Sequence, residues 1–303
     1  MERLFPASIH TIGLISPASR PDADRVASTR RFLEESGIKT VLAPNAIESD
    51  SLGYCCGSPE MRLSDFHTML NDPRIDLILC TCGGFGCAHL LPGLDFDLLR
   101  ERNLPVYGQS DISALHLAMF AKHAGIPVCS PTASRLSESL GYESSRRSFR
   151  NVLRKHSAPR KLVLESISSS SDTTISGGIV LSNLTVMTTL CGTPWMPDLH
   201  SCVLALEDVR EDVYIIDRNL THLIQAGVID QVQAVIFGYF VDCGPEDKIR
   251  ELIRCFAART GKPVFCGLEF GHKNPKNSYR LGEQIEIISA GRKDLCRRKR
   301  NQP

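Results

Sequence analysis

The fold assignment depends on residues 105–122, PVYGQSDISALHLAMFAK. A short apolar run, Pro105-Val106-Tyr107, leads into Gly108-Gln109-Ser110-Asp111 and then into a segment with strong helical character. A serine on a tight turn between a strand and a helix exposes its hydroxyl beside free helix amides, which suits a nucleophile. Serine is also a favoured N-cap, and Asp111 suits the first turn of a helix, so this segment alone leaves both interpretations open.

The residues on both sides of this turn alternate between predicted strands and helices. We expect a near-continuous apolar strand at residues 75–80, of the kind that is buried on both faces. The βαβ order predicts a doubly wound parallel sheet, in which ligands bind at the carboxyl ends of the strands. Ser110 and the turn Gly83-Gly84-Phe85-Gly86 both fall at such ends. The other predicted strands are 11–15, 40–43, 105–107 and 127–129, and the predicted helices are 23–36, 59–71 and 111–122.

The second half of the chain predicts another domain, of mixed α/β type. Its expected strands include residues 178–181, 203–206, 264–266 and 283–288, and its expected helices are 216–226 and 246–259. Between the halves, the serine-rich stretch around residues 166–171 reads as a connector. The predicted organisation is therefore a nucleophile domain at 1–155, a linker at 156–177 and a C-terminal domain at 178–303.

Composition excludes several classes of protein. The 303 residues carry a net charge of +1, which argues against a nucleic-acid partner. The sequence shows no signal peptide and no apolar run of membrane-spanning length, so we expect a cytoplasmic protein with no membrane partner and with its 12 cysteines reduced. It has neither a Cys-x-x-Cys pair nor a His-Glu-x-x-His motif, so we expect no metal and no cofactor. The basic tail Arg297-Arg298-Lys299-Arg300 is expected to be solvated.

A serine nucleophile needs a base and a carboxylate that orients it. Among nine histidines, His272 differs because it follows a predicted strand and lies in a loop rich in glycine and proline. Glu207 and Asp208 come directly after a predicted apolar strand, where a carboxylate can hold an imidazole; a capping role is the alternative. The backbone amides of Gly84 and Asp111 could form an oxyanion hole.

Several of these pieces occur together in an order that resembles the LD-carboxypeptidase family of serine peptidases, which act as muramoyltetrapeptide carboxypeptidases. The resemblance covers nearly the whole chain, and its specificity comes from the ordered set. The matching pieces are Gly13-Leu14-Ile15-Ser16-Pro17-Ala18-Ser19, Cys82-Gly83-Gly84-Phe85-Gly86, Leu90-Leu91-Pro92-Gly93-Leu94-Asp95, Gly108-Gln109-Ser110-Asp111, Gly192-Thr193-Pro194-Trp195, Leu206-Glu207-Asp208, Ile216-Asp217-Arg218 and Gly267-Leu268-Glu269-Phe270-Gly271-His272.

The resemblance implies a flavodoxin-like N-terminal domain that carries the nucleophile Ser110, and a C-terminal domain that carries the base His272 and its orienting residue Glu207. It places the active site in a cleft between the domains. It implies a hydrolase that removes the terminal D-alanine from peptidoglycan tetrapeptides, cutting the bond from an L-diamino acid, during peptidoglycan recycling in the cytoplasm. The muropeptide would contact Gly83, Asn183 and Trp195, and the protein would be a homodimer.

Two departures from the family pattern concern substrate binding. Cys82 stands where the family commonly has arginine, and Leu181-Ser182 stand where it tends to have two glycines before an asparagine, here Asn183. Two alternatives stay open. A related serine hydrolase of the self-immunity type would cleave peptidyl-nucleotide antibiotics, with Trp195 stacked on a nucleobase or simply packed in the protein. A non-catalytic relative would bind muropeptide without cleaving it.

Overall fold

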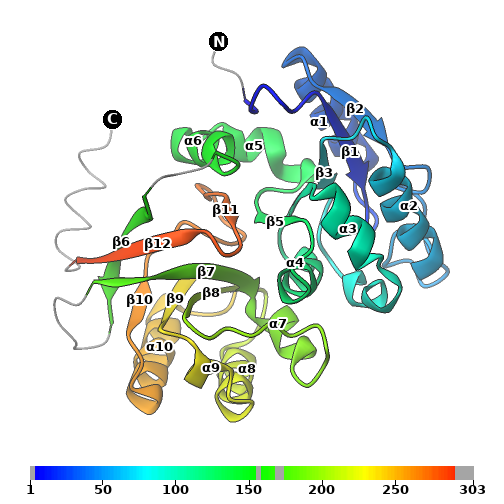
Figure 1. Ribbon diagram of the computed structural model, residues 1–303. Coiled ribbons are helices and arrows are strands. Elements are labelled where there is room, and N and C mark those ends of the chain that lie inside the picture. The colour runs from blue at the N-terminus through cyan, green and yellow to red at the C-terminus, as the bar shows by residue number, and fades with distance from the viewer. Residues whose placement is uncertain (1–3, 155–157, 168–173, 291–303) are drawn as a thin grey trace. The chain divides into compact units, whose positions relative to one another are not determined.

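The computed structural model describes residues 4–154, 158–167 and 174–290, and these form two compact units (Figure 1). Unit 1 consists of residues 4–154, 193–197 and 274–281, and unit 2 contains the other described residues. The basic tail and most of the serine-rich stretch lie outside the described residues. Each unit is therefore assembled from segments that are far apart in the sequence.

Unit 1 contains a six-stranded sheet with the order β11-β5-β4-β3-β1-β2. The strands β1 to β5 run parallel, and β11, orange in Figure 1, lies antiparallel to the green β5. The order β2-β1-β3-β4-β5 is that of flavodoxin-like sheets, so the predicted fold class is confirmed. The strand bounds are β1 Thr11–Ile15, β2 Lys39–Leu42, β3 Leu77–Cys80, β4 Pro105–Gly108, β5 Ile126–Cys129 and β11 Tyr279–Arg280.

Three helices of unit 1, α1, α2 and α3, begin at side-chain caps. Helix α2 follows Ser58, whose hydroxyl accepts a hydrogen bond from the Met61 amide, and Pro59 occupies its first turn. Helix α4 is buried from Ile112 to Met119, which explains why its sequence is apolar all round. The bounds are α1 Ala23–Glu35, α2 Pro59–Asn71, α3 Phe96–Arg102, α4 Ile112–Ala121, α5 Leu136–Leu140 and α6 Glu143–Asn151.

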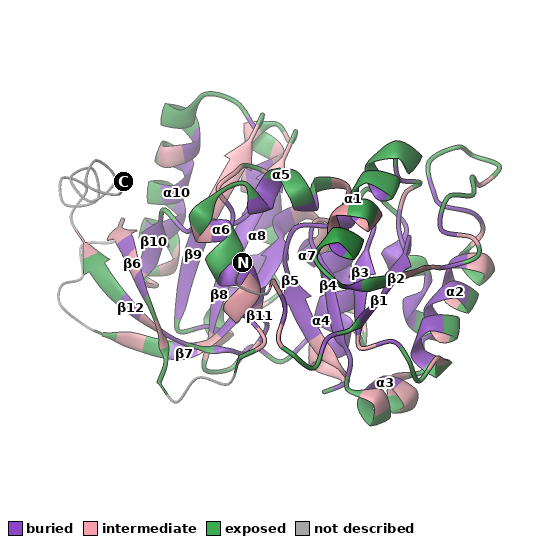
Figure 2. Ribbon diagram, turned by 90° about the horizontal axis from the view of Figure 1, so that it is seen from above, coloured by how far each residue is buried: buried purple, intermediate pink, exposed green. Residues whose placement is uncertain are grey.

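Unit 2 is a closed barrel with the strand order β10-β6-β12-β7-β8-β9, in which parallel and antiparallel pairs both occur. The predicted mixed α/β character is confirmed. Strands of both units are mainly purple, the colour of buried residues, in Figure 2, whereas α10 shows green on one side. The bounds are β6 Arg160–Ser166, β7 Ile175–Asn183, α7 Leu184–Leu190, β8 Cys202–Val209, α8 Val213–Gln225, α9 Val228–Gln231, β9 Ala234–Val241, α10 Glu246–Thr260, β10 Val264–Cys266 and β12 Gln284–Ala290.

Three features differ from the sequence-based expectation. The strand expected at residues 162–164 is confirmed as part of β6, which lies inside the segment predicted as a linker and pairs with β12 and β10 of the barrel. Glu207 and Asp208 lie within β8 and not after it, at a register irregularity against β9. Residues 193–197 and 274–281, placed in the C-terminal domain by the sequence, pack in unit 1. Among the described residues, no helix is both long and apolar enough to cross a membrane.

Candidate active site

Ser110 lies on the sharp turn between β4 and α4, at the carboxyl end of an interior strand of the sheet. Its φ is 67°, a left-handed conformation that residues other than glycine rarely adopt. Helix α4 has no side-chain cap, and the Ser110 carbonyl oxygen accepts a hydrogen bond from the Ser113 amide at 2.8 Å. The backbone therefore has the strain typical of a nucleophile elbow, and the Ser110 side chain does not cap the helix.

Gly83 packs directly against Ser110. A Cβ atom at Gly83 would lie 2.6 Å from Ser110 Cβ and 3.0 Å from Ser110 Oγ, so only glycine allows this approach. Ser19 holds the loop that follows: its amide donates to the Gly83 carbonyl at 3.2 Å, and its hydroxyl accepts from the Phe85 amide at 3.1 Å. Cys82, where the family commonly has arginine, donates its thiol to the Ser19 carbonyl at 3.0 Å.

The Asp111 side chain links this glycine loop to the elbow. Its Oδ2 accepts a hydrogen bond from the Cys87 amide at 2.8 Å. Burial raises the pKa of the Asp111 carboxyl, and the hydrogen bond from Cys87 and the charge of Arg62 oppose that shift. The two residues predicted to form an oxyanion hole, Gly84 and Asp111, therefore belong to two segments that are tied together beside Ser110.

Trp195 lies in the segment 193–197 of unit 1, where it packs against other side chains. Its ring stacks on Phe96, with centroids 5.6 Å apart and an interplanar angle of 22°. The Lys122 Nζ lies 5.2 Å from the Trp195 ring centroid. These contacts account for Trp195 as a packed aromatic residue, which was one of its two predicted roles.

In unit 2, Glu207 and His272 form a hydrogen-bonded pair. Glu207 Oε2 lies 2.7 Å from His272 Nδ1, and the side chains are 2% and 20% exposed respectively. Glu207 sits at the irregularity of β8, and bulges of this kind aim side chains next to active sites. Complete burial raises the pKa of Glu207, whereas the hydrogen bond and charge of His272 lower it.

Asn183 supports this pair from the neighbouring strand. It is directly opposite Glu207 in the β7–β8 register and is 4% exposed. Its side-chain amide donates to Glu207 Oε1 at 3.3 Å and to Asp208 Oδ1 at 2.8 Å, and its oxygen accepts from the Val186 amide to cap α7. Asp208 Oδ2 in turn accepts from the amide and the hydroxyl of Thr185. Asn183, predicted to bind substrate, is thus placed to orient the Glu207 carboxylate.

The helix histidines have other roles. His116 is buried, its ring lies 3.0 Å from the Val106 carbonyl through Nε2, and burial lowers its pKa to about 4. His116 is therefore neutral at physiological pH and is part of the core, as expected for a helix position. Within the described ranges, no group of three or more His, Cys, Asp or Glu side chains could hold a metal ion.

The predicted site residues form two groups. Unit 1 brings together Ser110, Asp111, Gly83 and Gly84, with Trp195 in the same unit, and unit 2 brings together Glu207, His272 and Asn183. The sequence reasoning missed three residues that hold these groups in place, Ser19, Arg62 and Thr185. Ser19 stands inside one of the motifs quoted for the family resemblance, as does Asp208, the partner of Thr185. Arg62 lies on the same face of its helix as Phe66 and Met69, and this spacing was the signal that could have identified it.

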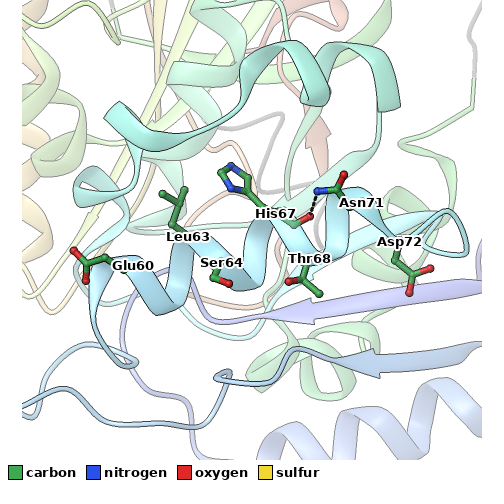
Figure 3. Close-up of a pocket in the computed structure, with 7 residues that line it drawn as sticks. All are labelled: Glu60, Leu63, Ser64, His67, Thr68, Asn71 and Asp72. Atoms are coloured by element: carbon green, nitrogen blue, oxygen red, sulfur yellow. Dashed lines mark hydrogen bonds between the residues drawn. The ribbon is translucent and has the colours of Figure 1, made fainter.

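Several cavities among the described residues lie outside these groups. One of about 700 Å³ runs along the outer face of α2, and Figure 3 shows its lining residues between Glu60 and Asp72, with an Asn71–His67 hydrogen bond. It contains none of the predicted site residues. A cavity of about 560 Å³ in unit 2 is lined by Tyr239, Arg250, Gly267 and Lys273 among others. Gly267 and Lys273 flank the loop of His272, so this second cavity lies beside that loop.

The chain matches two models of known domains. Residues 12–130 match the LD-carboxypeptidase N-terminal domain, and residues 176–287 match the LD-carboxypeptidase C-terminal domain.

Individual proteins are similar over most of their length. A probable murein peptide carboxypeptidase of Bacillus subtilis is 28% identical, with 93% of this chain and 92% of the relative covered. A murein tetrapeptide carboxypeptidase of Pseudomonas aeruginosa is 30% identical, with 90% and 91% covered. The microcin C7 self-immunity protein of Escherichia coli is 27% identical, with 91% and 90% covered. The crystal structure of an MccF-like protein from Bacillus anthracis superposes with a TM-score of 0.81 at 25% identity, covering 94% of this chain and 95% of that one.

Proposed function

Because the chain belongs to the LD-carboxypeptidase family, we propose that it is a serine carboxypeptidase that removes the terminal D-alanine from murein tetrapeptides. The observation that carries the proposal is the buried Glu207 carboxylate on His272 Nδ1. This is the orienting half of a catalytic triad, and the strained turn at Ser110 has the form of the nucleophilic half.

The chemistry follows from which nitrogen of His272 is occupied. Because Glu207 accepts the Nδ1 proton, Nε2 carries the lone pair and acts as the general base. In the proposed reaction Ser110 Oγ attacks the carbonyl of the diamino acid, and His272 takes the Ser110 proton and returns it to the amine of the departing D-alanine. Glu207 stabilises the imidazolium, and the amides of Gly84 and Asp111 stabilise the oxyanion. Water, activated by His272, then hydrolyses the acyl-enzyme.

The chain connects the two groups of site residues over a short stretch. The chain passes from unit 2 into unit 1 between Lys273 and Asn274, directly after the base His272. In unit 1 the continuing segment is tied down close to the elbow, since Lys276 Nζ donates to Gln109 Oε1 at 3.4 Å and the Lys276 amide donates to Ser145 Oγ at 3.0 Å. Gln109 precedes Ser110, so the base loop is continuous with a segment attached beside the nucleophile.

The proposal includes a setting for the enzyme. The murein-related names of the relatives support a muropeptide substrate and a role in peptidoglycan recycling. A cytoplasmic location and a homodimer, both implied by the family resemblance, are part of the proposal. Cell fractionation and analytical ultracentrifugation of the purified protein test these two parts.

The test is release of D-alanine, followed by mass spectrometry, from murein tetrapeptides that contain either meso-diaminopimelate or lysine. We expect turnover of one or both by the wild type and none by Ser110→Ala, with an unchanged circular dichroism spectrum. Ser64→Ala, on the exposed face of α2, is the matched control and should keep full activity. Turnover by a folded Ser110→Ala variant would contradict the mechanism.

The self-immunity hydrolase is the second candidate, favoured by the similarity to the microcin C7 self-immunity protein. An aminoacyl sulfamoyl adenylate offered beside the tetrapeptide separates the two functions. The stacking of Trp195 on Phe96 weighs against a free tryptophan platform for a nucleobase.

A non-catalytic muropeptide-binding relative is disfavoured because a buried carboxylate on a histidine serves no binding role of its own. The departures at Cys82 and at Leu181-Ser182 lie outside Ser110 and the Glu207–His272 pair.

A further inference from the structure

Arg62, near the start of α2, is a buried arginine whose Nη1 is bonded to two backbone carbonyls. It is 2% exposed. Its Nη1 donates to the carbonyls of Pro17 at 2.7 Å and Gly86 at 2.8 Å, and its Nη2 lies 3.3 Å from His89 Nδ1. Burying a guanidinium is costly unless its hydrogen bonds and charge are used, so a buried arginine with these partners needs a reason.

The partners of Arg62 lie on the two segments that shape the glycine loop. Pro17 precedes Ser19, which binds the Gly83 carbonyl and the Phe85 amide. Gly86 ends the glycine turn, and the next residue, Cys87, donates its amide to Asp111. The loop is so close to Arg62 that a Cβ atom at Gly86 would lie 2.4 Å from Arg62 Nη1. Arg62 therefore links the segment of Pro17 and Ser19 to the end of the glycine turn at Gly86, and the Gly84 amide belongs to that turn.

We propose that Arg62 is a positioning residue for the oxyanion hole, which rests on the proposed function. It does not touch substrate. It fixes the Gly86 carbonyl, while Asp111 fixes the Cys87 amide, and these two contacts hold the Gly84 amide of the intervening loop in one orientation. Oxyanion holes depend on donors that are oriented before the reaction, and a displacement of 1 Å can cost about 100-fold in rate.

Arg102 provides a matched control within unit 1. Its guanidinium also binds three backbone carbonyls, with Nη1 on Leu70 and Asp72 and Nη2 on Ile75 at 3.0 Å. These carbonyls lie between α2 and β3, away from the glycine loop. Substitution of either arginine leaves its backbone carbonyls without these donors and lowers stability. Only substitution of Arg62 should change catalysis.

The experiment compares Arg62→Lys and Arg62→Met with Arg102→Lys and Arg102→Met. For Arg62→Met we expect kcat for D-alanine release to fall about 100-fold and KM to change less than about threefold, since the oxyanion forms only in the transition state. Arg62→Lys keeps the charge and should lose about tenfold. The Arg102 variants should keep kcat. If Arg62→Met does not fold, Arg62→Lys decides, and a folded Arg62→Lys with kcat within twofold of wild type overturns the proposal.

A second readout separates this proposal from the proposed function. Amide hydrogen exchange of peptides covering residues 82–89 should accelerate in Arg62→Lys and remain at the wild-type rate in Arg102→Lys. Equal exchange in the two variants overturns the positioning role even if the wild type is active on tetrapeptide. If the wild type releases no D-alanine, the proposed function fails, and the exchange rates still decide whether Arg62 holds the loop.

Discussion

Glu207 Oε2 lies 2.7 Å from His272 Nδ1, and the carboxylate is buried while the imidazole stays one-fifth exposed. The carboxylate thus fixes the tautomer of a ring that can still meet a substrate. Because burial raises the pKa of Glu207, this carboxylate takes up a proton at higher pH than an exposed one, and activity should fall on the acid side of the pH profile.

Glu207→Gln removes the charge that stabilises the imidazolium and can leave the ring in the wrong tautomer. We expect kcat to fall about 10³- to 10⁴-fold with little change in KM, as for other triads. Steady-state kinetics of D-alanine release measure both constants. Asp217→Asn, which removes an exposed carboxylate of the same unit, is the control and should leave kcat unchanged. An equal effect of the two substitutions would contradict the orienting role.

Gly271→Ala tests the close approach of the base loop to Glu207. Gly271 has a φ of 120°, and a Cβ atom there would lie 2.8 Å from Glu207 Oε2, so alanine must displace the carboxylate. We expect kcat to fall at least about tenfold because orientation of the base is lost. Gly227→Ala also introduces a side chain at positive φ, but into open space, and should cost stability alone. Paired kinetics and thermal melts distinguish the two effects.

Gly83→Ala tests the contact with the nucleophile. The added methyl group would lie 2.6 Å from Ser110 Cβ, so Ser110 or the glycine loop must move. We expect labelling of Ser110 by a fluorophosphonate probe to slow by about 100-fold, the cost of a 1 Å displacement. Gly93→Ala crowds the end of Leu63 instead, at a similar distance, and should label at the wild-type rate. Unchanged labelling of a folded Gly83→Ala variant would show that this contact is unimportant.

Asn183→Asp separates a positioning role from a substrate contact. The new carboxylate would lie beside Glu207 and Asp208, and like charges raise the pKa of Glu207 further. The acidic limb of the kcat/KM profile should therefore move to higher pH, while KM at high pH stays close to wild type. Asn219 is a buried asparagine that contacts Thr185 and not Glu207. Asn219→Asp should therefore shift the acidic limb of the pH profile less. A large rise in KM with an unmoved limb would indicate a substrate contact instead.

His116→Gln should change how stability depends on pH. Burial lowers the pKa of His116 from 6.5 to about 4, so between these values the unfolded chain binds a proton that the folded chain does not. His116 therefore removes stability as pH falls from 6.5 to 4, by up to about 3 kcal/mol. Glutamine can keep the hydrogen bond to Val106 without this loss. Urea unfolding at pH 7 and pH 4.5 measures the difference, with the exposed His222→Gln as control.

Local signals in the sequence were sufficient for much of the fold. Helix α2 has the predicted bounds 59–71, because Ser58 and Pro59 mark its start and Phe66 and Met69 lie on one face. Strand β10 matches its prediction as well. Helix α7 was missed because its seven residues, LTVMTTL, are rich in β-branched side chains, and its cap is the side chain of Asn183.

The missed parts of the site depend on contacts between distant residues. We predicted that Glu207 and Asp208 follow a strand, because charged side chains are rarely buried within one. The hydrogen bonds from Asn183 and Thr185 satisfy these carboxylates and make their burial tolerable. We predicted no role for Arg62, because the carbonyls that it binds belong to Pro17 and Gly86, far from it in the sequence. The sequence shows which residues are polar, but their hydrogen-bond partners are distant in the sequence and are known only from the fold.

Strand β11 of unit 1 comes from residues 279–280, although the other strands of its sheet end at residue 129. On the ribosome, the edge of β5 stays unpaired until the chain has been made beyond residue 280. The base His272 emerges only a few residues before the strand that completes the sheet of Ser110. A translation product interrupted before residue 272 would therefore carry an open sheet edge and would lack the proposed base, so His272 and the closed sheet are acquired in the same short stretch of synthesis.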